Sequence, residues 1–312
     1  MVQENLADPR GRIVVLLGPT ATGKTGVSLE LARRFSLEIV NCDASQFYIG
    51  LDIGTAKPDA GELAQAPHHL FDIAPPEQPI NAGDYVALAD EAIARIYSRG
   101  STPLVVGGTG MYIRALTRGL AAIPQVSPEV QQRVREKLDR TGSQRMYLEL
   151  QQVDPDSAGR ISANDPQRIS RALEVYQETG RTITSFQDEH RFAPQRYVAF
   201  KAGLHFEPDH LKKRIAKRVH QMFEAGFPGE VRRLLEEGSD FTVRTFKALG
   251  YRDVADFVQG NIGKEEAISR VITLHQRYAK RQRTWFGKDA DVNWFKPQEE
   301  SLLYDKVGGF LA

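Results

Sequence analysis

The chain has 312 residues, of which 41% are hydrophobic and 26% charged, and its formal net charge is +1. This length favours two domains or one domain with a large insertion, and the near-neutral charge argues against a generally polycationic protein. The single cysteine, Cys42, excludes an internal disulfide and fits a reducing cytoplasm. The polar first twelve residues lack the apolar region of a signal peptide, and the apolar run at 13–17 is too short to span a membrane.

Short apolar runs alternate with helical patterns through the first 120 residues. Strands are predicted at 13–17, 38–42 and 103–106, and a helix is predicted over 84–99. Helical patterns also follow the first and third of these strands. The alternation predicts an α/β fold with a parallel sheet and helices on both faces, whose ligands bind at the carboxyl ends of the strands.

The turn between the first strand and its helix carries the most specific local motif. It completes the pattern G-x-x-x-x-G-K-[S/T] of a phosphate-binding loop (P-loop) with Gly18, Pro19, Thr20, Ala21, Thr22, Gly23, Lys24 and Thr25. Its glycines let backbone N–H groups close around an anion, and the helix N-terminus adds partial positive charge. Lys24 would add a full charge, and Thr25 would place a hydroxyl on Mg²⁺. The flanking strand and helix disfavour a chance match in a glycine-rich turn.

Two more polar residues are expected at the same edge of the sheet. Asp43 ends the second strand, where it would act as a general base, help to hold Mg²⁺ through water, or merely cap a turn. Thr109 lies in the turn 107–110 after the third strand, where it would contact a substrate or cap the next helix.

The pattern becomes helical after Pro124. Ser127 and Pro128 are typical of a helix start, a second helical stretch contains Met146, and a third runs from Asp165 to Gly180. A strand is predicted over 197–206, helices over 208–287, and a last strand at 292–295. We therefore predict a catalytic core of residues 1–124 and 196–312, interrupted by a helical inserted domain of residues 125–195.

Basic residues cluster in two helical segments, 212–218 and 277–288, the second of which is interleaved with aromatic residues. Arg214 and Arg218 lie beside the apolar stripe of their helix and would reach into a cleft. Arg168 and Arg171 share a face of an inserted helix. Such patterns suit nucleic acid, with charge for phosphates and rings for unstacked bases, but solvated helical faces look the same.

The P-loop alone leaves its ligand open. A nucleoside triphosphate would make the protein an ATP-binding kinase, with Asp43 as the base for an acceptor hydroxyl. An alkyl diphosphate would be held by its leaving group while carbon is attacked, on RNA or on free AMP. An RNA-binding module whose loop only switches conformation is a third possibility.

Several segments together closely resemble the tRNA dimethylallyltransferases (tRNA isopentenyltransferases). They occur in consistent order between about residues 13 and 295 and comprise 43–48, 51–58, 67–70, 107–112, 165–174, 250–252 and 278–285. The family usually has Asp-Ser where this chain has Asp43-Ala44. The chain has no C-terminal set of Cys and His residues for a zinc finger, which fits the bacterial form.

The resemblance implies a P-loop NTPase-like fold and transfer of a dimethylallyl group from dimethylallyl diphosphate, with Mg²⁺, to tRNA. The acceptor would be N6 of adenine 37 in the anticodon stem-loop of tRNAs that read codons starting with U, giving N6-isopentenyladenosine. Asp43 would be the base, and Thr109 and Arg218 would contact the diphosphate side. We expect a cytoplasmic monomer.

Residues in five segments look like the family's contacts to tRNA. They are Asp43, Ala44, Ser45, Gln46, Gln131, Gln167, Arg168, Ile169, Ser170, Arg171, Lys247, Ala248, Leu249, Gly250, Tyr251, Arg252, Lys280 and Arg281. This expectation favours nucleic-acid contact over a solvated face for the basic segments.

Overall fold

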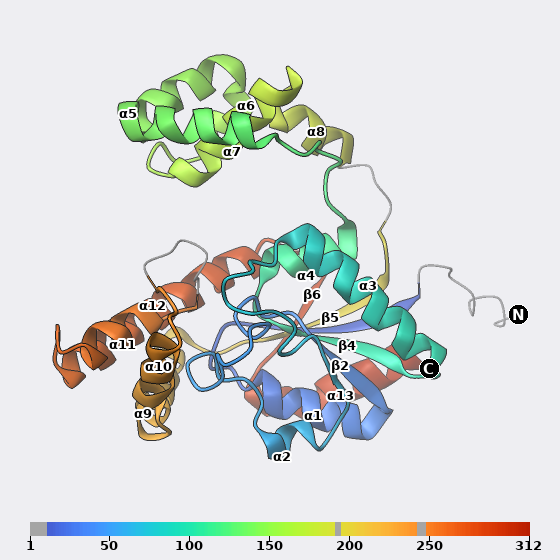
Figure 1. Ribbon diagram of the computed structural model, residues 1–312. Coiled ribbons are helices and arrows are strands. Elements are labelled where there is room, and N and C mark those ends of the chain that lie inside the picture. Colours follow the sequence, from blue (N-terminus) through green and yellow to red (C-terminus); the bar gives the residue numbers. More distant parts are fainter. Residues whose placement is uncertain (1–10, 191–194, 242–247) are drawn as a thin grey trace, which may run out of the picture. The chain divides into compact units, whose positions relative to one another are not determined.

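The computed structural model describes residues 11–190, 195–241 and 248–312 (Figure 1). The chain divides into two compact units, one made of residues 1–117 and 195–312 and the other of residues 118–194. The first boundary therefore precedes the residue 125 expected from the sequence. Ala121, Ile123 and Val126 explain this difference, because they pack into the core of the second unit.

The first unit contains a six-stranded parallel sheet in the order β3-β2-β4-β1-β5-β6. Its strands are β1 (Arg12–Leu17), β2 (Leu37–Asn41), β3 (His68–His69), β4 (Thr102–Gly107), β5 (Val198–Leu204) and β6 (Val292–Phe295). The predicted α/β class is confirmed, and β3 was missed because two residues show no periodicity. The central strand β1 pairs with β4 on one side and with β5 on the other, so the order of the strands reverses there. In open parallel sheets, ligands bind at the carboxyl ends of the strands at such a point.

Residues of β1 alternate between two hydrophobic cores, one on each face of the sheet. Ile13, Val15 and Leu17 face the core formed with α3 (Ala82–Ser98) and α4 (Gly110–Arg118). Val14 and Leu16 face the core formed with α1 (Lys24–Phe35) and α13 (Glu300–Leu311). Helices thus cover both faces of the sheet (Figure 1), which leaves the strand ends as the accessible polar edge.

A third core of the first unit joins the C-terminal helices to a long loop. These helices are α9 (Pro208–Glu224), α10 (Phe227–Glu236), α11 (Tyr251–Val258) and α12 (Lys264–Phe286). The loop follows β2 and leads into the short α2 (Ala60–Leu63). Phe227 and Tyr251 are fully buried in this core, together with Leu51 from the loop after β2. The loop is thereby packed against the helices that carry the basic segments.

The second unit is helical, with α5 (Pro128–Val153), α6 (Pro155–Ala158), α7 (Pro166–Thr179) and α8 (Ile183–His190). Gly142 interrupts α5 with a φ of 74°, a conformation that other residues rarely adopt. The Asp165 side chain caps α7, and Gly180 ends that helix as expected. Ser127 differs from expectation, because its hydroxyl donates to Glu178 instead of capping α5. None of the helices that the structure describes could cross a membrane.

An ion pair at one end of β2 provides a test of the sheet's stability. Buried Glu38 accepts hydrogen bonds from Arg99 (2.6 Å) and His69 (2.8 Å). The Arg99 guanidinium, helped by His69, lowers the pKa of Glu38 to about 2 against the cost of burial. A carboxylate with a lowered pKa stabilises the fold above its unfolded pKa, and this stabilisation is lost as the pH falls toward about 2.

We therefore expect Glu38→Gln to lower the free energy of unfolding at pH 7 and to lose this effect between about pH 4.5 and pH 2. Urea unfolding over this pH range would measure it, with Glu91→Gln on an exposed pair as the control. A deficit that stays constant as the pH falls would show that the Glu38 charge does not contribute.

Candidate active site

The P-loop lies between β1 and α1, and its backbone takes conformations that open N–H groups toward one side. Gly18, Ala21 and Gly23 have φ values of 153°, 65° and 90°. α1 begins at Lys24, so the N-terminus of this helix points its unpaired N–H groups into the same space. This is the geometry of an anion site.

Lys24 lies over this loop. Its ammonium donates to the backbone oxygens of Gly18 and Pro19, both at 3.0 Å. Burial lowers the pKa of Lys24 to about 8, with Arg218 adding to this effect and Asp43 opposing it. A bound anion would therefore be held by a charged amine below about pH 8.

Two arginines of α9 border the loop from the other side. Arg214 donates to the backbone oxygen of Ala21 at 2.7 Å, and Arg218 donates to the Thr20 hydroxyl at 3.2 Å. Burial lowers the pKa of Arg218, and Arg214 lowers it further, while Asp43 opposes both. Both arginines thus contact the loop, although Arg214 is exposed like Lys212, Lys213 and Lys217, and only Arg218 is half-buried.

Gln282 of α12 holds the P-loop to the turn that follows β4. Its side-chain oxygen accepts from the backbone N–H of Thr20, and its nitrogen donates to the backbone oxygen of Gly108, both at 2.9 Å. Gly108 leaves room for this contact, since a Cβ there would lie 2.1 Å from the Gln282 amide nitrogen. One buried side chain therefore connects two loops at the sheet edge.

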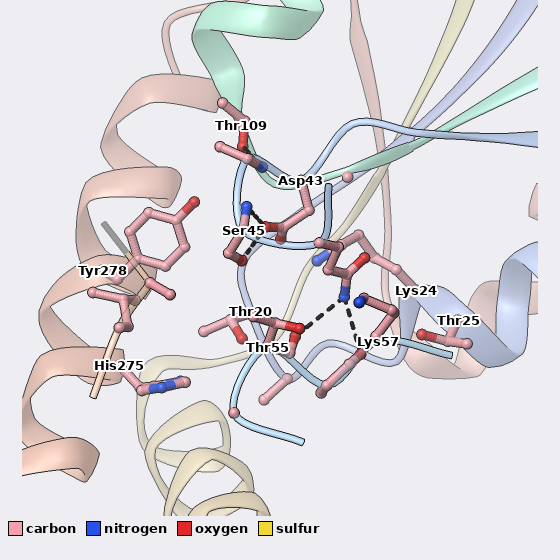
Figure 2. A pocket seen from close by; sticks show the side chains of 18 of the residues that line it. Thr20, Lys24, Thr25, Asp43, Ser45, Thr55, Lys57, Thr109, His275 and Tyr278 are labelled. Carbon is pink, nitrogen blue, oxygen red and sulfur yellow. Dashed lines mark hydrogen bonds between the residues drawn. The ribbon is translucent and has the colours of Figure 1, made fainter. Parts of the chain in front are cut away.

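Asp43 lies opposite the P-loop, and its orientation is fixed by its neighbours. Its Oδ1 accepts from the Ser45 N–H at 3.0 Å and from the Ser45 hydroxyl at 2.6 Å. The Thr109 hydroxyl accepts from the Ala44 N–H at 3.0 Å and interacts with the Tyr278 hydroxyl. In Figure 2, Asp43, Ser45 and Thr109 lie on one wall, while Tyr278 and His275 project from α12 on the facing wall.

Lys24, Asp43, Arg218, His275 and Tyr278 border one cavity of about 530 Å³, a volume typical of small-molecule sites. Its lining includes the predicted residues Thr20, Ala21, Gly23, Lys24, Thr25, Asp43, Ala44, Ser45, Gln46, Thr109, Arg218, Ala248, Leu249 and Arg281. The structure thus brings together the phosphate loop, the expected base and part of the expected tRNA-contacting set.

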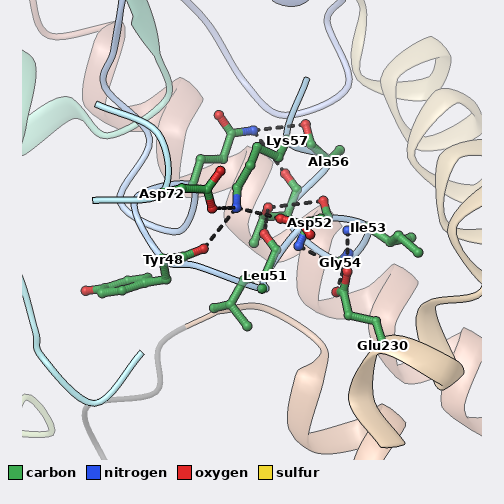
Figure 3. A network of polar contacts seen from close by, with 12 residues as sticks. Tyr48, Leu51, Asp52, Ile53, Gly54, Ala56, Lys57, Asp72 and Glu230 are labelled. Carbon is green, nitrogen blue, oxygen red and sulfur yellow. Dashed lines mark hydrogen bonds and ion pairs between the residues drawn. The ribbon is translucent and has the colours of Figure 1, made fainter. Parts of the chain in front are cut away.

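The loop between Tyr48 and Lys57 forms part of the cavity wall and is held by two buried charges (Figure 3). Glu230 of α10 accepts from the backbone N–H groups of Asp52, Ile53 and Gly54 at 3.1, 2.7 and 3.2 Å. Lys57, whose side chain is 4% exposed, donates to the Tyr48 backbone oxygen and pairs with Asp52 and Asp72. The Gln46 amide adds two bonds to the backbone oxygens of residues 55 and 56.

Two residues expected to contact tRNA are buried instead. Tyr251 is fully buried and its hydroxyl donates to Glu230 at 2.6 Å, so it supports the loop from behind. Ile169 is fully buried in the core of the second unit. The resemblance identified segments and could not distinguish their inward from their outward positions. Contact of these two residues with tRNA stays a prediction, to which their buried side chains lend no support.

The other expected tRNA contacts differ in accessibility. Gln131, Gln167, Arg168, Arg171, Arg252, Lys280 and Arg281 are exposed. The Ser170 hydroxyl is buried and has no partner among the described residues, and Gly250 begins α11 with a φ of 87°. Lys247 lies outside the described residues. Their contact with tRNA stays a prediction.

The site also contains residues that the sequence analysis did not select, namely Lys57, Glu230, His275 and Gln282. His275, Tyr278 and Gln282 are three and four residues apart, so they share one face of α12. That spacing could have indicated from the sequence that the three side chains line one site. Glu230 offered none, because a glutamate in an amphipathic helix is usually solvated.

The donor set fits a magnesium ion that binds together with a phosphate ligand. Thr25 provides one hydroxyl in the first turn of α1 and borders the cavity. Within the described ranges, no group of three or more Asp, Glu, His or Cys side chains could hold a metal by itself. Mg²⁺ commonly takes one or two protein ligands and completes its shell with phosphate oxygens and water.

The fold and the site define a P-loop-like α/β protein in which a loop suited to an anion lies opposite a carboxylate. The family model described as IPP transferase matches residues 46–289. The chain is 43% identical over 289 residues to "tRNA dimethylallyltransferase 1" of Pelobacter propionicus, covering 93% of this chain and 94% of the relative. It is 41% identical to the tRNA dimethylallyltransferase of Geobacter sulfurreducens, with 93% of each chain covered.

Solved structures give the same result. The full-length tRNA isopentenylpyrophosphate transferase of Bacillus halodurans matches with a TM-score of 0.71 and 34% identity over 96% of each chain. A eukaryotic dimethylallyltransferase acting on tRNA matches with a TM-score of 0.78 and 26% identity, over 92% of this chain and 74% of that one. The chain belongs to the IPP transferase family.

The buried Glu230 network allows a test of how the cavity wall is held. We expect Glu230→Ala to leave three backbone N–H groups without their acceptor, so that amide hydrogen exchange of residues 52–57 accelerates by about tenfold or more. Hydrogen-exchange mass spectrometry would measure it, with the exposed Glu236→Ala as the matched control. Unchanged exchange in this loop would mean that Lys57 and Gln46 hold it without Glu230.

Proposed function

We propose that this protein transfers a dimethylallyl group from dimethylallyl diphosphate to N6 of adenine 37 in tRNAs that read codons starting with U. The observation that carries the proposal is that Asp43 and the P-loop border the same cavity, within a chain of the IPP transferase family. The diphosphate would occupy the P-loop, and the adenine would enter from the side of Asp43. The bacterial and eukaryotic relatives bear names or titles that state this class of activity.

The chemistry follows from the charges around the cavity. The carbon–oxygen bond of the donor breaks and its electrons stay on the diphosphate, where the P-loop N–H groups, Lys24 and Arg218 stabilise the developing charge. A bond forms between N6 and the allylic carbon. The N6 proton passes to Asp43, whose Oδ1 is fixed by Ser45.

Mg²⁺ held at Thr25 would supply further positive charge to the diphosphate. Because a P-loop also suits a nucleotide, nucleoside triphosphate binding is a competing use of the same residues. We place the chemistry on the alkyl diphosphate, since Asp43 faces the loop across a cavity that an acceptor can enter.

The target adenine must leave its stack to reach Asp43. The face of α12 offers groups for the RNA near the cavity, because Arg281 borders the cavity and lies over the Tyr278 ring at 5.6 Å. Exposed arginines of α7 offer further cationic contacts. We propose that the protein acts as a cytoplasmic monomer on the anticodon stem-loop.

The role of Asp43 is open to a direct test. We expect Asp43→Asn to lower turnover by about 10²–10⁴-fold, because the amide cannot accept the N6 proton, and to leave tRNA affinity nearly unchanged. The assay follows labelled dimethylallyl diphosphate onto an anticodon stem-loop with adenines at positions 36–38, with the exposed Asp209→Asn as control. Absence of label with the unmodified protein would refute the proposed function, and equal turnover in Asp43→Asn would remove Asp43 from the mechanism.

A phosphate contact by Arg281 predicts a change in salt dependence. We expect Arg281→Ala to weaken stem-loop binding and to reduce the slope of log K against log salt by about one. Fluorescence anisotropy over a range of salt concentrations would measure the slope, with Arg33→Ala on α1 as a control whose side chain is 72% exposed. If both variants keep the slope of the unmodified protein, Arg281 does not contact a phosphate and lies on a solvated face of α12.

A further inference from the structure

His275 is a buried polar residue of the cavity wall for which the mechanism above has no use. It is 6% exposed, and its Nε2 has no hydrogen-bond partner within the described part of the chain. Leaving a buried nitrogen of this kind unpaired destabilises the fold, so it is unusual unless a ligand satisfies it. The side chain projects from α12 toward the cavity (Figure 2).

The surroundings of His275 indicate which ligand that would be. Among charged groups, Arg218 has the largest effect on the pKa of His275 and lowers it, while Asp43 raises it. Arg218 also contacts Thr20 of the P-loop. Burial and Arg218 lower the pKa of His275 to about 4, so the free protein holds a neutral imidazole. A group that places negative charge next to Arg218 would act in the opposite direction and favour the charged ring.

Positive charge prevails among the other groups that face the cavity. The charged residues of its lining are Lys24 of α1, Arg218 of α9, Arg281 of α12, Lys57 and Asp43 of the loop after β2, and Glu62 of α2. Lys57 is already paired with Asp52 and Asp72. Asp253 of α11, the other helix packed on α12, lies 4.0 Å from Arg270. An anion is therefore the class of ligand that this environment favours.

We propose that His275 is a further contact for the diphosphate and takes up a proton when that anion binds. The inference rests on the proposed function, because it places the diphosphate in this cavity. In the bound state the imidazolium donates from Nε2 to a phosphate oxygen, and the proton comes from solvent. Diphosphate affinity is then linked to pH through a residue outside the phosphate loop.

Inorganic pyrophosphate with a fixed excess of Mg²⁺ is the probe, and isothermal titration calorimetry of the full chain between pH 6 and 8.5 is the measurement. His275→Gln keeps a donor near Nε2 but cannot take up a proton, whereas His275→Leu loses both properties. We expect His275→Gln to bind about as tightly as the unmodified protein at pH 8.5 and about tenfold more weakly at pH 6. His275→Leu should bind more weakly at both pH values.

Titration of the pyrophosphate itself is the same for every variant, so it cancels in the comparison. The exposed His220→Gln on α9 is the matched control and should follow the unmodified protein. Calorimetry in buffers of different ionisation enthalpy should show less proton uptake in His275→Gln near pH 6.5. The imidazole NMR signal of His275 can be identified because it is absent in His275→Gln. At pH 6.5 it should report a neutral ring in the free protein and a charged ring when pyrophosphate is bound.

Three results separate the inference from the function on which it rests. If the unmodified protein and His275→Gln have the same pH profile and proton uptake, the inference is wrong while the diphosphate site stands. Loss of binding in Lys24→Ala together with a pH-dependent deficit in His275→Gln supports both. If the unmodified protein does not bind pyrophosphate, the proposed donor site fails and the inference with it.

Discussion

The concentration of positive charge at the carboxyl end of β1 is the constraint on which the rest of the site depends. Besides burial, Arg218 lowers the pKa of Lys24 and Arg214 lowers the pKa of Arg218, and among the named contributors only carboxylates oppose these effects. Two cations that are partly withdrawn from water and repel each other destabilise the fold unless they are held in place. Here the backbone oxygens of Gly18 and Pro19 hold Lys24, and the Thr20 hydroxyl holds Arg218. An anion in this space would offset the repulsion between the cations, which is the physical reason to propose a binding site here.

The geometry of this charge depends on segments that are far apart in the sequence. Gln282 connects the P-loop to the turn after β4 from the last third of the chain, and Glu230 holds the wall of the cavity from α10. Both are buried, and each satisfies several backbone groups at once. The C-terminal helices are therefore part of the catalytic core and cannot be regarded as an accessory RNA-binding layer.

These long-range contacts also define what the sequence could predict. The strands β1, β2, β4, β5 and β6 were predictable because each is a short apolar run at a regular place in the α/β alternation. The P-loop and Asp43 were predictable because strand order alone brings strand ends to one edge. Glu230 was not, since its burial depends on Tyr251 and on a loop 176 to 178 residues away in sequence. The burial of Tyr251 and Ile169 was not predictable either, because segment resemblance carries no information about which way a side chain faces.

The position of Asp43 bears on which bond the site would break. In transfer of a phosphoryl group, the charge is spread over the equatorial oxygens of the group in transfer, and a carboxylate can accept the proton of the acceptor hydroxyl. In transfer of an allylic carbon, the whole diphosphate leaves with the electrons, so cations must surround it on several sides. Lys24, Arg218 and the α1 N-terminus provide that arrangement. The adenine amine is a weak nucleophile whose proton becomes acidic only as the new bond forms, and a carboxylate fixed by Ser45 across the cavity is suited to accept it at that point. The two halves of the cavity thus match the two charges that such a reaction creates, one on the departing diphosphate and one on the alkylated nitrogen.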